Sequence, residues 1–156
     1  MSFSTWHNYG LGLRTDTIET TIEKVKNFIA LSPDLLDKIN AFYESENRKF
    51  DDVNLDEFLC EDMDCIDDIN AAYTGLAAII AEVIYEKENI ELLCCDNFEG
   101  EAYCIFPPMY PWNMTQKESS MTENDIKDIF AKYIKLLTDQ SLDELGFGYQ
   151  EVENGG

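Results

Sequence analysis

The sequence has few positively charged residues. Its 156 residues include 11 lysines and arginines but 32 aspartates and glutamates, so the formal net charge is −21 at pH 7. Proteins that bind DNA or RNA directly use lysine and arginine to neutralise the phosphates, and a chain of this charge repels them. The composition therefore argues against direct nucleic-acid binding. It leaves open whether the negative charge serves a function or only solubility.

Histidine and phosphate-binding motifs are also scarce. His7 is the only histidine, and it lies in an alternating segment on the same side as Leu11 and Leu13. Because Ser-His-Asp and Cys-His systems need a histidine base, we expect a structural His7, no catalytic residues and no enzyme activity. Residues 9–16, YGLGLRTD, lack both the third glycine of a dinucleotide-binding loop and the Lys-Ser/Thr of a P-loop.

The cysteines do not have the spacing of the common metal sites. They are odd in number, and the first ten residues have neither a basic start nor an apolar run, which predicts reduced thiols in a cytoplasmic protein. No pair has zinc-knuckle spacing, and Asp62–Asp68 lacks the glycine and closing glutamate of an EF-hand loop. We expect no metal and no cofactor, and cysteines that fill the core: Cys60, Cys65, Cys94, Cys95 and Cys104.

The longest low-charge run is somewhat short for a membrane span. It extends from Ile69 to Tyr85 and contains Asn70, Thr74 and Glu82. Its branched apolar residues recur at helical spacing, and alanines occupy several of the positions between them. We therefore predict that residues 67–89 form a buried central helix.

Shorter patterns predict the remaining elements. Alternation over residues 2–13 predicts a strand in which Gly10 and Gly12 leave room for a close neighbour. Further strands are predicted as a hairpin, Ile90–Cys95 with Ala102–Phe106, and as a final strand, Leu145–Val152. Helices are predicted over Thr15–Leu31 with Asp16 or Thr17 as the cap, from Pro33 after the cap Ser32, around Leu55–Cys60, and over Thr122–Thr138.

Together these elements predict an α+β fold in one domain over residues 1–156. We expect three to four mainly antiparallel strands packed with four to five helices around the central helix. Residues 153–156 are expected to form a short flexible tail.

Negative charge is concentrated in residues 51–68, which we call the acidic belt. Its carboxylates alternate with apolar residues such as Val53, Leu55 and Phe58, which predicts a folded support that holds the carboxylates outward. We expect the belt to bind a partner through Asp51, Asp52, Asp56, Glu57, Glu61, Asp62, Asp64, Asp67 and Asp68. Secondary contacts are expected from Glu99, Glu101, Tyr110 and Trp112.

In general character the chain resembles the phage-encoded acidic inhibitors that imitate DNA, which include many anti-CRISPR proteins. The resemblance covers small size, strong acidity and the lack of catalytic residues, and no specific motif carries it. It implies an inhibitor that competes with nucleic acid for a basic groove of a partner, with a Cas effector nuclease as the leading candidate. Two alternatives stay open: an adaptor or immunity-type protein that binds through the aromatic, proline-rich loop 107–113, and a carrier that uses the terminal Gly155 and Gly156.

Overall fold

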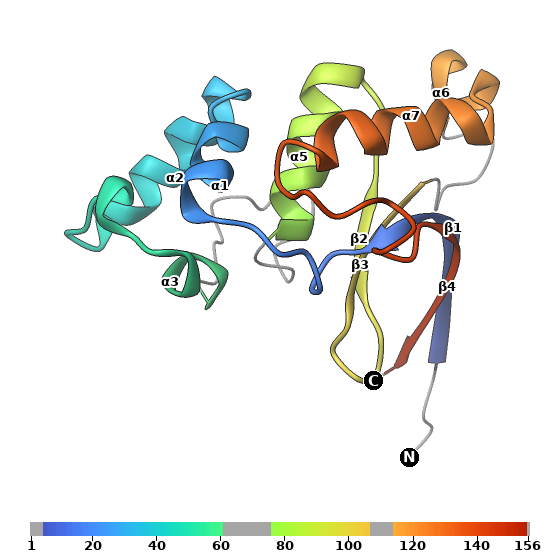
Figure 1. Cartoon of the computed structure of the whole chain (residues 1–156), viewed down its shortest axis with the longest axis horizontal. Helices are drawn as coiled ribbons and strands as arrows, with labels where there is room; N and C mark the ends of the chain where they lie inside the picture. The colour runs from blue at the N-terminus through green and yellow to red at the C-terminus, as the bar shows by residue number, and fades with distance from the viewer. Residues whose placement is uncertain (1–4, 61–75, 107–113, 156) are drawn as a thin grey trace.

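The fold is built on a sheet of four antiparallel strands in the order β2-β3-β1-β4, with helices packed against it (Figure 1). The computed structural model describes residues 5–60, 76–106 and 114–155. The predicted α+β class and antiparallel sheet are confirmed. The strands are β1 (Thr5–Arg14), β2 (Leu93–Asp96), β3 (Ala102–Phe106) and β4 (Gly148–Gly155).

The described residues form six α-helices and one short 3₁₀-helix, η1. One short helix, α6, has no counterpart in the sequence prediction. The helices are α1 (Ile22–Ile29), α2 (Pro33–Ser45), η1 (Phe50–Asp52), α3 (Leu55–Cys60), α5 (Leu76–Glu88), α6 (Gln116–Ser120) and α7 (Glu123–Ile134).

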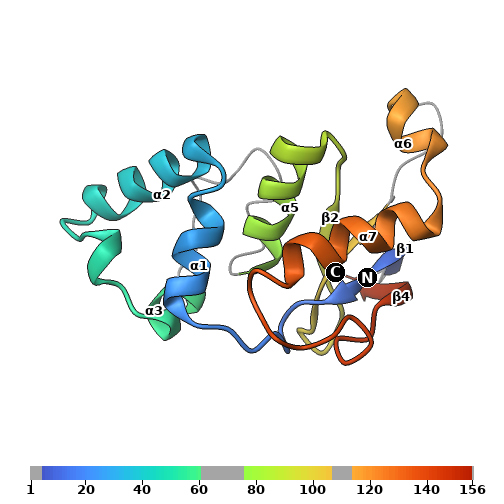
Figure 2. The same cartoon turned by 45° about the horizontal axis from the view of Figure 1, so that its top comes forward.

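Helix α5 is the centre of the core. From Leu76 to Ile84 every residue except Glu82 is buried, and the helix lies between α1 and α7 and against β2 and β3 (Figure 2). The predicted burial is confirmed for this part, and residues 67–75 of the predicted helix lie outside the described residues. Within the described ranges, no helix is both long and apolar enough to cross a membrane.

Two glycines in β1 allow β3 to approach very closely. A Cβ added at Gly12 would lie 2.0 Å from the carbonyl oxygen of Cys104, and one at Gly10 would lie 3.0 Å from that of Phe106. Real Cβ atoms do not come as close to backbone atoms as one at Gly12 would, so only glycine fits there without displacing β3, whereas at Gly10 an added Cβ would make a tight contact. The predicted close neighbour of both glycines is confirmed.

The close approach leads to a second, small apolar cluster on the side of the sheet opposite the main core. Ile105 of β3 and Val152 of β4 are buried there together with Cys95 of β2. Strands β2 and β4 are not neighbours in the sheet, yet they are in contact. The sheet therefore curls, and the bare backbone at Gly10 and Gly12 lets side chains of β3 and β4 meet across β1.

Two helix caps predicted from the sequence are confirmed. The side-chain oxygen of Ser32 accepts a hydrogen bond from the N–H of Leu35 at the start of α2, and Pro33 occupies the first turn. Thr122 and Asp125 form a capping box at the start of α7. Each of these caps depends only on residues within one turn, which makes it readable from the sequence.

Helix α1 begins later than predicted. Its N-cap is Thr21, not Asp16 or Thr17. Asp16 instead accepts two hydrogen bonds from the guanidinium of Arg14, at 2.7 and 2.8 Å, and one from the N–H of Ala102 at 3.2 Å. The Asp16 carboxylate is therefore engaged with β1 and β3 and does not cap a helix.

The last two elements also differ from the prediction at their ends. Helix α7 ends at Ile134 rather than Thr138. Strand β4 begins at Gly148 and pairs with β1 as far as Gly155. The tail predicted to be flexible from residue 153 is thus strand through Gly155, because ladder hydrogen bonds come from the backbone and do not need an apolar pattern.

Candidate acidic interaction surface

The described part of the acidic belt is a folded support that carries exposed carboxylates. Phe50, Val53 and Phe58 are buried, and the ring of Phe50 stacks on that of Tyr43 with centroids 5.5 Å apart. The side chains between these anchors are exposed: Asp51, Asp52, Asp56 and Glu57. The predicted arrangement is present over residues 51–59, because aromatic packing against α2 fixes the backbone from which the carboxylates project.

Glu57 differs from its exposed neighbours in its contacts. One of its carboxylate oxygens lies 2.8 Å from Nη2 of Arg48, and the other accepts a hydrogen bond from Nδ2 of Asn54 at 2.8 Å. The backbone N–H of Glu57 donates a hydrogen bond to the side-chain oxygen of Asn54 at 2.9 Å, at the start of α3. Glu57 therefore has a structural role at the beginning of α3, and Asp51, Asp52 and Asp56 are the better candidates for contact with a partner.

The remaining belt residues named in the sequence prediction, Glu61, Asp62, Asp64, Asp67 and Asp68, lie outside the described residues, as do Tyr110 and Trp112. The loop 107–113, on which the adaptor alternative rests, lies outside them as well.

The two predicted secondary carboxylates have different surroundings. Glu101 forms an ion pair with Arg14 and accepts a hydrogen bond from Nδ2 of Asn97 at 2.8 Å. Glu99 is exposed at the tip of the β2–β3 hairpin, beside Gly100 at φ 79°. Glu99 remains a candidate contact, whereas Glu101 ties the hairpin to β1.

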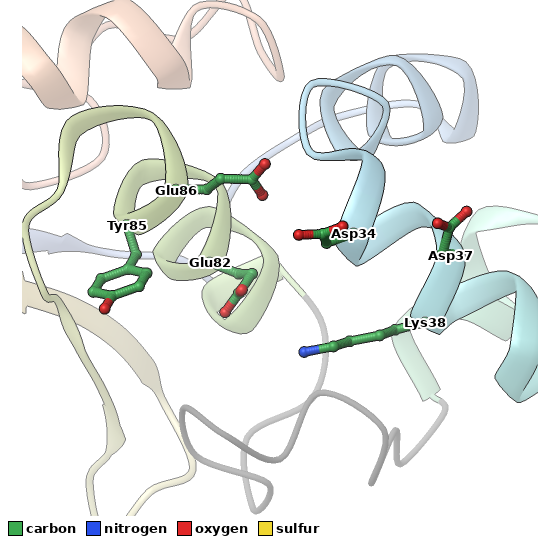
Figure 3. A pocket seen from close by; sticks show the side chains of 6 residues that line it. All are labelled: Asp34, Asp37, Lys38, Glu82, Tyr85 and Glu86. Atoms are coloured by element: carbon green, nitrogen blue, oxygen red, sulfur yellow. The ribbon is translucent and has the colours of Figure 1, made fainter.

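A cleft between α2 and α5 adds further carboxylates to the acidic surface. It has a volume of about 370 Å³ and is lined by Asp34, Asp37, Lys38, Glu82, Tyr85 and Glu86. Figure 3 shows the Asp34 and Glu86 carboxylates facing each other across this space, with the Lys38 side chain extending toward it from α2. Glu86 also accepts a hydrogen bond from Ser32, the cap of α2. Sequence reasoning missed the cleft, because these carboxylates are spread over two helices that only the tertiary fold brings together.

Many basic side chains are held in internal contacts. Arg14 binds Asp16 and Glu101, and the hydrogen bond from Arg14 holds the pKa of the Asp16 carboxyl below its usual range. Burial would raise the pKa of Glu88, but hydrogen bonds from Tyr133 and Lys132 outweigh it and lower that pKa. Such pairs neutralise carboxylates where elements meet and leave the exposed carboxylates of the belt in excess.

His7 is not on an apolar face, contrary to the sequence prediction. Its side chain is partly exposed: Nδ1 lies 3.0 Å from a carboxylate oxygen of Glu151, and Nε2 lies 3.8 Å from one of Glu153. Strands β1 and β4 extend beyond the helices that cover the sheet (Figure 1). The alternation of β1 correctly assigns His7 to the side of Leu11, but at this point none of the described helices covers that side.

Three cysteines are buried and form no disulfide, as expected of core thiols: Cys94, Cys95 and Cys104. Burial raises the pKa of the Cys95 thiol to about 12, so it is protonated and unreactive near neutral pH. Among the residues that the structure describes, no group of three His, Cys, Asp or Glu side chains is placed to hold a metal ion. Cys60 and Cys65 are not covered by these observations.

No protein-family model, curated protein or solved structure matches the chain.

Proposed function

We propose that the protein is an acidic inhibitor that binds the basic nucleic-acid groove of a partner and thereby excludes the nucleic acid. The observation that supports this proposal most directly is the exposure of Asp51, Asp52 and Asp56 on a support anchored by buried aromatic rings. A rigid support presents charge without the entropic penalty of ordering a flexible tail on binding. The net charge of −21 adds long-range attraction toward a basic groove.

The proposed mechanism is competition without turnover. Carboxylates would occupy positions where the groove otherwise binds phosphates, and no bond is made or broken. Electrostatic attraction of this kind accelerates association, to about 10⁸–10⁹ M⁻¹s⁻¹ at low salt, and weakens as salt is added. At 0.1 M ionic strength charges are screened over about 10 Å, so a strong loss of binding between low and moderate salt is expected.

The partner class is tested first with guide-loaded Cas nucleases, which carry a basic channel for nucleic acid. The purified protein is added to each nuclease before or after its DNA target, and DNA binding and cleavage are measured. Competition predicts that inhibition weakens as the DNA concentration is raised, and that it is strongest when the protein is added before the DNA. Inhibition that does not change with the DNA concentration would contradict a competitive mechanism, and no inhibition of any nuclease would remove Cas nucleases as the proposed partner.

The surface is tested with two double variants of equal charge change. Asp51→Lys with Asp56→Lys reverses the belt, while Asp128→Lys with Asp143→Lys reverses two exposed carboxylates elsewhere. Both variants are tested against a partner whose complex with the protein is displaced by duplex DNA. We expect the belt variant to bind this partner at least about tenfold more weakly than the control variant. Equal binding by the two variants would show that net charge alone, and not the belt, determines the affinity.

A further inference from the structure

Strand β4 is an edge of the sheet. The described strands have the order β2-β3-β1-β4, so among the described residues β4 is paired on one side only, with β1. It lies at the end of the molecule opposite α3, and with β1 it extends past the helices (Figure 1). An open edge strand offers unpaired backbone groups to which another extended chain can add as a further strand.

The register shows which backbone groups of β4 point outward. The N–H of Thr15 donates to the carbonyl of Ala102 at 2.8 Å, which continues the β1–β3 register of Leu13 with Cys104. In an antiparallel ladder, hydrogen-bonded pairs alternate with pairs that are not hydrogen-bonded. The N–H and C=O groups of odd-numbered residues of β1 therefore point toward β3, and those of even-numbered residues point toward β4. Gly12, the partner of Gly148, is therefore among the residues bonded to β4.

The same alternation carries over to β4. Its even-numbered residues face β1, so the N–H and C=O groups of Tyr149, Glu151 and Glu153 point away from the sheet. No backbone hydrogen bond joins these three residues to another element within the described ranges. Each of them offers one donor and one acceptor to a strand that adds to the edge.

The side chains of these residues define what kind of strand can add. Tyr149 is 71% exposed, and its hydroxyl donates to the carboxylate of Glu123 at the start of α7. Glu151 and Glu153 are also exposed. Across the ladder, His7 lies beside both of these carboxylates. The edge thus combines outward backbone groups with a row of negative charge and one exposed aromatic ring.

We propose that the edge of β4 is a docking site for an extended, lysine- or arginine-bearing segment of a partner protein. Its backbone would pair with Tyr149, Glu151 and Glu153, and its basic side chains would lie beside the two glutamates. Charge complementarity favours this occupant over a second copy of the chain, because two copies that paired through β4 would bring their glutamates together. The exposed ring of Tyr149 can in addition pack against a lysine or arginine side chain.

This inference goes beyond the proposed function, since it concerns a different surface and a different type of contact. The two ideas share only the requirement for a basic partner. The probe is a ten-residue peptide that alternates lysine with threonine or valine, added to the full chain and followed by amide NMR shifts and hydrogen exchange. We expect the shifts and the new protection to centre on residues 149–153. The same peptide with alternate backbone amides methylated should bind at least about tenfold more weakly, because it cannot complete the ladder.

Two sets of variants complete the test. Glu151→Pro removes an outward N–H and is compatible with an edge strand, so we expect it to abolish peptide binding and to leave β1–β4 pairing intact, as checked by thermal unfolding. The double variant Glu151→Lys with Glu153→Lys keeps the outward N–H and C=O groups of the edge. It should no longer bind the lysine peptide, and it should bind a peptide in which glutamate replaces each lysine. The matched control is Asp128→Lys with Asp143→Lys.

Three outcomes would overturn the inference. The first is equal binding of the methylated peptide, which would mean attraction by charge alone. The second is binding of the charge-swapped peptide by the control variant as well as by the edge variant. The third is protection of residues 149–153 in a dimer of the chain without any peptide. The belt variant with Asp51 and Asp56 reversed should still bind the lysine peptide at the β4 edge, which distinguishes failure at this edge from failure of the proposed function.

Discussion

Replacing Gly12 with alanine tests the closest backbone approach in the sheet. The new Cβ would lie 2.0 Å from the carbonyl oxygen of Cys104 and 2.7 Å from the Cα of Ile105. Both are backbone atoms, so the clash cannot be relieved by a rotamer change and β3 must move. Overpacking of this kind costs about 1–3 kcal/mol and occasionally more, and rigid backbone neighbours place Gly12→Ala at about 3 kcal/mol or above. For a chain of this length that loss lowers Tm by roughly 6–12 °C.

Gly148 is the matched control because it is the residue paired with Gly12 across the β1–β4 ladder. A Cβ at Gly148 meets nothing within 4 Å. Gly148→Ala should therefore be neutral or stabilising by about 0.4–1 kcal/mol, since alanine restricts the unfolded chain. Urea unfolding of both variants, followed by circular dichroism, gives the two free energies. If Gly12→Ala is as stable as Gly148→Ala, the close approach of β3 to β1 is incorrect.

Three further predictions concern a cap, a pKa and a thiol. Ser32→Ala removes both the cap of α2 and the hydrogen bond to Glu86, and should cost about 1–2 kcal/mol of unfolding free energy in urea titrations. Asp16 has a pKa lowered by its hydrogen bond from Arg14, so its contribution to stability is present above the ordinary value near 3.8 and is lost as pH falls through the lowered pKa. Asp16→Asn should thus be less stable than the parent at pH 7, and the difference should shrink on acidification. Cys95, buried and with its pKa raised to about 12, should resist a thiol reagent at pH 8 in the native protein and react after unfolding, as read by mass spectrometry.

The elements whose signals are local were predictable from the sequence. The cap of α2 at Ser32 and the short helix α3 depend on neighbouring residues, and both appear with the predicted residues. The predicted start of α1 was wrong. Aspartate is a common helix cap, but the Asp16 carboxylate accepts hydrogen bonds from Arg14 on β1 and from the N–H of Ala102 on β3. The contact with Ala102 joins residues 86 apart in the chain and cannot be read from one sequence.

The candidate surface could be predicted in position but not in the role of each carboxylate. Asp56 and Glu57 are adjacent and equally exposed by pattern, yet Glu57 binds Arg48 and Asn54 while Asp56 projects from the support. The difference depends on where Arg48 lies in three dimensions. The same limit applies to the cleft between α2 and α5, whose carboxylates are far apart in sequence.

The placement of the basic residues bears on how the charge-reversal variants are interpreted. Lys26 donates to the backbone carbonyl of Asp51, and Lys132 of α7 lies 3.2 Å from the carboxylate of Glu88 on α5. These cations join elements that pack together. Among the described belt residues, Glu57 is paired with Arg48, whereas the exposed side chains of Asp51, Asp52 and Asp56 have no cation partner within the described ranges and repel one another. Reversing the side chains of Asp51 and Asp56 therefore reduces self-repulsion and leaves the internal pairs intact. Asp56 lies in the first turn of α3, where a carboxylate is stabilising by up to about 1 kcal/mol, and the loss of this interaction opposes the gain from reduced repulsion. The belt variant should therefore stay close to the parent in stability, as urea unfolding can check, so a loss of binding in that variant reports on the surface and not on unfolding.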